Sequence, residues 1–270
     1  MTTSPDSWVY GDFAPDPASR DLPGLKARWL LEQLPAATAP RVLDFGVGEG
    51  KYLHLVRTVK PAAHLVGVDI RAPHGAPDFE FHQVPPGSAL PFDADTFDVI
   101  VSCDVLEHVE NLDEALQEIH RVLRPGGSFI GFVPAEGGLG PHALFRFLDS
   151  GIYRDTKDHN HAYTRRDLLR RFSSRFRIVR LAYSYHLLGA TLDAVFFAAF
   201  KLPILGPRLE GFWRGQDNDV YRASAASGTR RSLASRVIQV ANRAAYYEST
   251  VFRNFQLGAK GLHFHLQKRA

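Results

Sequence analysis

The chain has 270 residues, 45% of them hydrophobic and 23% charged, which is the ordinary balance of a globular protein with a sizeable core. The single cysteine, Cys103, excludes an internal disulfide framework and a cysteine-based zinc knuckle, and it favours a reducing, cytoplasmic compartment. The net charge is +3, yet residues 1–150 hold 11 Lys and Arg against 21 Asp and Glu, whereas residues 151–270 hold 21 against 8.

Helices and strands alternate through the first half of the chain. The expected elements are a helix at 22–34, a strand at 41–45, a helix at 51–59, strands at 64–70, 79–84 and 97–103, a helix at 112–123 and a strand at 128–133. The last helix carries Asp113 and Glu114 in its first turn, where the helix dipole favours acid, and the RPGG at 124–127 ends it. This alternation predicts right-handed crossovers and a parallel sheet.

The second half of the chain completes the sheet with two further strands. Thr164 and Asp167 form the pattern of a capping box at the start of a helix. Strands are expected at 176–185 and 261–268, and about seventy residues lie between them instead of a short hairpin link. Neither the N-terminus nor the apolar stretch at 187–205, which Asp193 and Lys201 interrupt, predicts a signal peptide or a membrane span.

A glycine-rich turn directly follows the first strand in VLDFGVGEG, with Gly46, Gly48 and Gly50 at alternate positions. Glycine permits positive φ and lets a ligand approach without meeting a Cβ. Ligands of parallel sheets bind at the carboxyl ends of the strands, so a cofactor is expected here. A glycine turn that serves only helix–sheet packing is the alternative reading of one such motif.

The spacing of this turn favours some cofactors over others. A dinucleotide fingerprint needs G-x-G-x-x-G, but Lys51 occupies the position of its third glycine, and no G-K-[ST] follows as in a P-loop. Asp69 ends the second strand, where its carboxylate can accept both hydroxyls of an adenosine ribose. Asp44 precedes the turn and can accept backbone N–H groups or an ammonium group.

Four ordered segments carry a resemblance to a known family. They are VLDFGVGEGKYL, VGVDI, FDVIVSCDVLEHVEN and LRPGGSFIGFVP, which together cover residues 40–134. The chain resembles the class I S-adenosylmethionine-dependent methyltransferases of the broad small-molecule group. The resemblance implies a Rossmann-like α/β fold with a seven-stranded, mostly parallel sheet in the order 3-2-1-4-5-7-6, an antiparallel last strand and helices on both faces.

The resemblance also implies a cofactor site for S-adenosylmethionine. Asp44, Gly46 and Gly48 would line the methionine moiety beside Gly50. Asp69 would hold the ribose hydroxyls, with Ile70 packing on the adenine. Cys103 and Asp104 would supply contacts at the end of the fourth strand. The chain departs from the family at Pro86, where an acidic residue near the adenine amine is usual.

Methyl transfer to a hydroxyl requires a base, which is most often a histidine. The candidates after the fifth strand are His142, His159 and His161, and each can instead serve loop packing. We expect no metal. Asp104, Glu107 and His108 form the alternative, since D-x-x-E-H resembles the metal motif of some O-methyltransferases, although in metal-free relatives the Glu and His cap or pack.

The sequence predicts an N-terminal arm at 1–20, a methyltransferase domain at 21–186 plus 251–270, and a mostly helical insertion at 187–250. The insertion would cover a small-molecule or lipid-like acceptor, form a homodimer or contact a membrane surface. The arginines at 165–180 point in several directions without a stacking module, which argues against nucleic acid.

We therefore expect an enzyme that methylates a small or amphipathic acceptor, with oxygen as the target atom. Two alternatives stay open. One is a nicotinamide-dependent oxidoreductase, which Lys51 disfavours. The other is a non-catalytic module that binds S-adenosylmethionine without turnover.

Overall fold

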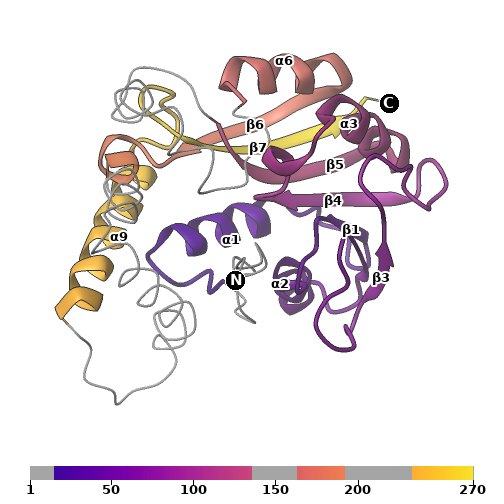
Figure 1. Cartoon of the computed structure of the whole chain (residues 1–270), viewed down its shortest axis with the longest axis horizontal. Helices are drawn as coiled ribbons and strands as arrows, with labels where there is room; N and C mark the ends of the chain where they lie inside the picture. The colour runs from indigo at the N-terminus through magenta and orange to yellow at the C-terminus, as the bar shows by residue number, and fades with distance from the viewer. Residues whose placement is uncertain (1–14, 136–162, 192–232, 270) are drawn as a thin grey trace, which may run out of the picture.

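The computed structural model describes residues 15–135, 163–191 and 233–269 (Figure 1). Their helices and strands are α1 (Leu22–Gln33), β1 (Arg41–Phe45), α2 (Lys51–Val59), β2 (His64–Asp69), β3 (Glu80–Gln83), β4 (Phe97–Cys103), the 3-10 helix η2 (Leu106–His108), α3 (Leu112–Val122), β5 (Leu123–Pro134), α6 (Arg165–Arg175), β6 (Phe176–Ser184), α9 (Leu233–Val251) and β7 (Gly261–Lys268).

The seven strands form one sheet in the order β3-β2-β1-β4-β5-β7-β6. Strands β1 to β5 pair in parallel with one another, whereas β7 pairs antiparallel with both β5 and β6. This is the order and the single reversed strand that the sequence predicted. Carboxyl ends of β1, β2 and β4 therefore meet at one edge of the sheet.

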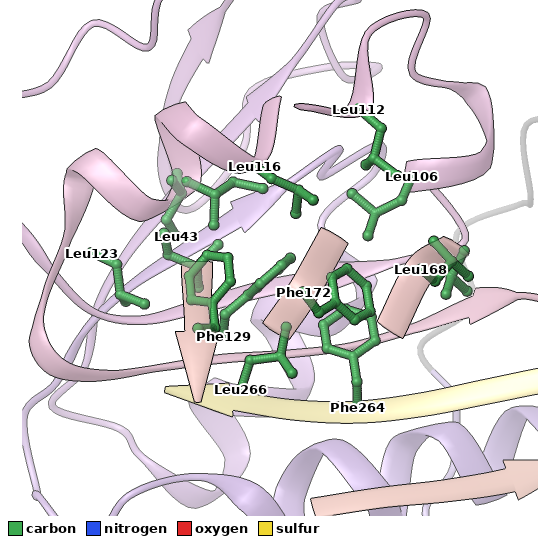
Figure 2. Packing of buried hydrophobic residues seen from close by; sticks show 14 of the residues in the cluster. Leu43, Leu106, Leu112, Leu116, Leu123, Phe129, Leu168, Phe172, Phe264 and Leu266 are labelled. Carbon is green, nitrogen blue, oxygen red and sulfur yellow. The ribbon is translucent and has the colours of Figure 1, made fainter. Parts of the chain in front are cut away.

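Hydrophobic side chains fill both faces of the sheet. One cluster joins α1 and α2 to the sheet through residues such as Leu30 and Leu53. Figure 2 shows the other, in which Leu116 of α3 and Phe172 of α6 lie over the strands. The Phe172 ring packs on Phe264 of β7 with centroids 4.9 Å apart. Helices on both faces explain why the central strands are mostly apolar.

Strand β5 differs from the sequence-based prediction. It begins at Leu123 instead of Ser128, because Leu123 already pairs with Phe97 of β4. The register then shifts between Phe97 and Val99, and Gly126 takes a φ of 77° inside the intervening turn. The RPGG segment thus ends the helix as expected but lies within the strand. The other predicted boundaries agree with the structure to within one residue.

The cap predicted for α6 is present. Thr164 Oγ1 accepts a hydrogen bond from the backbone N–H of Asp167 at 3.2 Å and donates one to the Asp167 carboxylate at 2.5 Å. Such a cap satisfies a backbone donor in the first turn.

Helix α9 lies in the segment between β6 and β7 and packs against α1 and β6 (Figure 1). Within the described residues, no helix combines the length and the apolar character that a bilayer crossing requires. The division into an arm, a domain and an insertion at 187–250 stays a prediction.

Candidate functional site

The three glycines after β1 all adopt left-handed backbone conformations, with φ of 83° at Gly46, 50° at Gly48 and 82° at Gly50. A Cβ on Gly46 would lie 2.4 Å from Cγ2 of Val105, and one on Gly50 would lie 2.3 Å from Cε1 of Phe79. A Cβ on Gly48 would meet nothing within 4 Å. Packing therefore accounts for Gly46 and Gly50, whereas Gly48 faces open space that a ligand can enter.

Asp69 at the end of β2 holds the glycine turn in place. Its Oδ2 accepts a hydrogen bond from the Gly48 N–H at 2.9 Å, and its Oδ1 accepts one from the Arg71 N–H at 3.2 Å. The carboxylate is only partly buried, so it has further lone pairs for a ligand. The next residue, Ile70, is 52% exposed, which leaves an apolar surface beside this carboxylate.

Asp44 lies in β1, two residues before the first glycine of the turn. It is buried, and its Oδ2 has no hydrogen-bond partner among the described residues. Burial raises the pKa of this carboxyl well above its usual range, the Lys51 charge lowers it, and the Asp69 charge raises it. A buried carboxyl oxygen without a partner is costly in free energy, and a ligand ammonium group would remove that cost.

At the end of β4, Cys103 and Asp104 have different surroundings. The Cys103 thiol is buried, and its pKa is raised by burial and by the nearby Asp104 and Asp44 charges, so it stays neutral. Asp104 has a φ of 58°, and both its carboxylate oxygens lie 2.7 Å from Nζ of Lys26. The structure thus brings an ion pair to this edge.

Lys26 is a site residue that the sequence did not reveal. It comes from α1, 78 positions from Asp104. Its Nζ also lies 3.9 Å from the centroid of the Phe132 ring of β5. Only the packing of α1 against the sheet unites these residues, and no local motif marks the contact.

His263 of β7 was also missed. Its ring is buried between Trp29 and Phe132, with centroid distances of 5.7 Å and 4.8 Å. Nε2 lies 2.9 Å from Oγ of Ser184, whereas the buried Nδ1 has no hydrogen-bond partner in the described chain. Burial lowers the pKa of His263 to about 3, with the Lys26 charge adding to the effect. The imidazole is therefore neutral at physiological pH.

The alternative metal set, Asp104, Glu107 and His108, stays a prediction. Asp104 pairs with Lys26, Glu107 is buried in η2, and His108 is exposed. In the parts of the chain that the structure describes, no three His, Cys, Asp or Glu side chains gather so that they could hold a metal ion. The candidate bases His142, His159 and His161 lie outside the described residues.

Together, these residues fit S-adenosylmethionine. The orphaned Asp44 oxygen suits the ammonium of the methionine moiety, and the open space at Gly48 admits the ligand beside the turn. The Asp69 carboxylate is placed for ribose hydroxyls, and exposed Ile70 for a flat apolar ring. The roles of the individual residues stay predictions.

Comparisons with known proteins agree with this geometry. A family model described as a methyltransferase domain matches residues 19–175. A mitochondrial 2-methoxy-6-polyprenyl-1,4-benzoquinol methylase of Mus musculus is 54% identical over 41 residues, 15% of this chain and 12% of the relative. A ubiquinone/menaquinone biosynthesis C-methyltransferase of Hahella chejuensis is 32% identical over 132 residues, 44% of this chain and 53% of the relative.

The fold is likewise similar to solved structures. The geranyl diphosphate C-methyltransferase of Streptomyces coelicolor, solved with S-adenosyl-L-homocysteine, superposes with a TM-score of 0.54 at 15% identity, covering 92% of this chain and 76% of that one. The sequence matches thus span about half or less of each relative, while the fold match spans nearly the whole chain. The chain belongs to the class I S-adenosylmethionine-dependent methyltransferases, and S-adenosylmethionine is its cofactor.

Proposed function

We propose that the protein methylates a hydroxyl oxygen of a small-molecule or amphipathic acceptor. The observation that carries the proposal is the edge formed by Asp44, Gly48 and Asp69, which offers a cofactor site directly before the segment that holds the candidate bases. That segment starts after Ala135, whose N–H donates to the carbonyl of Lys260 at 2.6 Å, at the carboxyl end of β5. An acceptor would enter over this end of the sheet.

The chain's own residues would bind and orient both reactants. Asp44 would accept the cofactor's ammonium, Asp69 would accept the ribose hydroxyls, and Ile70 would pack on the adenine. S-adenosylmethionine supplies a methyl group activated by a sulfonium. One of His142, His159 and His161 would remove the proton of the acceptor hydroxyl.

The described groups near this edge are poorly suited to that proton transfer. Asp104 is held by Lys26, the pKa of Cys103 is raised by burial, and the pKa of His263 is lowered to about 3. A base works best when its pKa lies near the working pH. This supports assigning the role to a histidine of the segment after β5.

Carbon methylation of a phenolic ring is a second candidate. The relative from Hahella chejuensis is named a C-methyltransferase of ubiquinone and menaquinone biosynthesis. A phenolate can accept a methyl group at oxygen or at a ring carbon, and both outcomes begin with removal of the same hydroxyl proton. Methylation at carbon also requires loss of the hydrogen at that ring carbon, and a proton returns to the oxygen. The two candidates therefore share the site and the base, and they differ in the orientation of the ring.

The test is turnover with S-adenosylmethionine labelled with ¹³C in its methyl group. Phenols, short-chain prenylated quinols and matched amines serve as acceptors, release of the demethylated cofactor is measured, and NMR identifies the atom that carries the label. We expect a methoxy signal with a hydroxyl-bearing acceptor, and loss of kcat without loss of cofactor affinity in one of His142→Ala, His159→Ala and His161→Ala.

A label on a ring carbon would establish the second candidate instead. Turnover with amines alone would contradict both. Absence of turnover in a folded protein that binds the cofactor would favour the non-catalytic module, while the family assignment already sets aside the nicotinamide-dependent oxidoreductase.

A further inference from the structure

Six large apolar side chains are exposed together where α9 ends and the chain approaches β7. They are Leu187, Leu188, Val251, Phe252, Phe255 and Leu257, and each is between 41% and 78% exposed. We call this set the apolar patch. Every residue from 251 to 257, with the sequence VFRNFQL, is exposed. Isolated exposed apolar residues are ordinary on a protein surface, but a contiguous group of them marks an interaction site.

The two parts of the patch are joined around the buried ring of His186. Its Nε2 lies 3.0 Å from the Phe255 carbonyl oxygen, and its ring centroid lies 6.0 Å from that of Phe252. The Phe252 and Phe255 rings are in turn 6.0 Å apart. Leu187 and Leu188 directly follow His186, and the backbone N of Leu187 lies 3.9 Å from the position of a Cβ on Gly258, so the two parts of the patch lie next to each other.

The backbone beneath the patch is held by hydrogen bonds. The Arg253 carbonyl accepts from the Tyr183 N–H of β6 at 2.7 Å, and the Phe255 N–H donates to the Phe252 carbonyl at 2.8 Å. This segment is therefore bonded to the sheet while its apolar side chains face outward. The hydrogen bonds hold the backbone in place, so the apolar side chains stay exposed on the surface.

Two exposed arginines lie on the segment that carries the patch. Arg243 is exposed on α9, and Glu248 is the one acidic residue in the sequence from 233 to 269. The Glu248 carboxylate accepts hydrogen bonds from the N–H groups of Leu188 at 2.6 Å and Gly189 at 2.9 Å. Both carboxylate oxygens of Glu248 are therefore bonded to the backbone beside the patch. Arg253 lies within the patch and is exposed. Like charges oppose pairing of this surface with its own copy, whereas an anionic surface complements it.

We propose that the apolar patch docks on the surface of an anionic lipid bilayer. The Phe and Leu side chains would enter the boundary between head groups and acyl chains, and Arg253, with Arg243 of α9, would contact lipid phosphates. The surface lies mainly at residues 251–257, just beyond the insertion at 187–250 for which the sequence predicted membrane contact. Docking through the apolar patch goes beyond the proposed methylation and does not depend on it.

Docking at this position would turn the active edge toward the membrane. Gly261 at the start of β7 pairs with Pro134 at the carboxyl end of β5 and with Ser184 at the end of β6. The patch therefore precedes β7 at the same carboxyl edge that holds the cofactor residues, at the β6 end of the sheet (Figure 1). An apolar acceptor dissolved in the bilayer would reach the enzyme from this side.

The experiment is flotation of the full-length protein with vesicles of phosphatidylcholine, with and without phosphatidylglycerol. We expect binding to the anionic vesicles only, weakened several-fold when salt is raised to about 0.5 M. The double variant Phe255→Ser/Leu257→Ser should bind at least about tenfold more weakly, because two exposed side chains no longer enter the lipid. Arg253→Glu should lose at least about fivefold.

Val59→Ser is the matched control, because Val59 at the end of α2 is 47% exposed but far from the patch in the fold. It should bind like the wild type, and all variants should unfold at the same temperature. The proposal is overturned by equal binding of the double variant, by equal binding to neutral vesicles, or by no binding at all. It is also overturned if the wild type forms a dimer that the double variant loses, since a second copy would then be the partner.

Discussion

Asp44 is a single residue whose burial costs stability and whose predicted role is to bind the cofactor. Burial raises the pKa of its carboxyl, so the folded state retains a proton that the unfolded chain has already released. Stability therefore falls as pH rises from the unfolded pKa, about 3.9, to the raised folded value, and it stays lower above that range. The oxygen that lacks a partner in the described chain is the group that a cofactor ammonium would satisfy.

The variant Asp44→Asn tests this account. Because the amide never ionises, we expect the free energy of unfolding at pH 7 to rise by about 1 kcal/mol or more, while S-adenosylmethionine binding is lost. Denaturant unfolding and calorimetric titration measure the two effects. Asp93→Asn, at an exposed aspartate, is the control. A less stable Asp44→Asn protein, or one with unchanged affinity, would contradict the account.

Substitutions at two glycines of the turn, Gly50 and Gly48, distinguish a packing role from a binding role. Gly50→Ala would press a methyl group against Phe79 at positive φ, so we expect it to lower the free energy of unfolding by roughly 3 kcal/mol. Gly48→Ala meets open space and should cost about 1 kcal/mol of backbone strain, yet lose at least about tenfold in cofactor affinity because the methyl group enters the ligand's place. Equal stability losses in the two variants, or wild-type affinity in Gly48→Ala, would show that the assignment is wrong.

At the scale of elements, local patterns predicted most of the sheet. The strands Arg41–Phe45, Phe97–Cys103 and Gly261–Lys268 have the expected bounds, because their apolar runs and flanking turns are local signals. Strand β5 was predicted too short. Its first residue, Leu123, belongs to the strand because it pairs with Phe97 of the neighbouring β4, and the local RPGG sequence contains no signal for that pairing. Tertiary pairing there overrides local turn propensity.

Helix α1 is tied to β4 by the ion pair of Lys26 and Asp104, which is largely buried. Lys26→Met keeps the apolar stem but leaves the carboxylate without this charge, and we expect a loss of about 2 kcal/mol in the free energy of unfolding. Asp104→Asn tolerates the positive φ at that position, so the double variant isolates the pair. Denaturant unfolding of all four proteins should give a coupling of about 1 kcal/mol or more, whereas purely additive losses would argue against the pair.

For the whole molecule, the alternation of helices and strands was enough to predict the architecture, because parallel sheets allow few connections. Motif residues of the site, such as Asp44 and Asp69, were equally visible since they lie at the carboxyl ends of strands that the sequence marks. Lys26 and His263 were not, because they approach the site from the two ends of the chain. Their spacing carries no signal, and only the folded sheet and α1 bring them together.

Buried His263 predicts how global stability depends on pH. Its folded pKa of about 3 lies below the unfolded value of about 6.5, so the unfolded chain binds the proton first and stability falls as pH drops below about 6.5. At pH 5 this histidine alone should cost about 2 kcal/mol. His263→Gln, which can still meet Ser184, should show a flatter dependence between pH 7 and pH 5 in denaturant unfolding. An unchanged slope would contradict the prediction.

Binding of the cofactor at the carboxyl edge is the central claim, and calorimetric titration tests it most directly. Wild-type protein should bind S-adenosylmethionine and its demethylated product with micromolar affinity. Asp69→Ala should bind at least about tenfold more weakly, because it removes the partner of the Gly48 N–H and the predicted partner of the ribose, while Asp93→Ala, at an exposed aspartate, should bind like the wild type. No binding heat from folded wild-type protein, or full affinity in Asp69→Ala, would contradict the account.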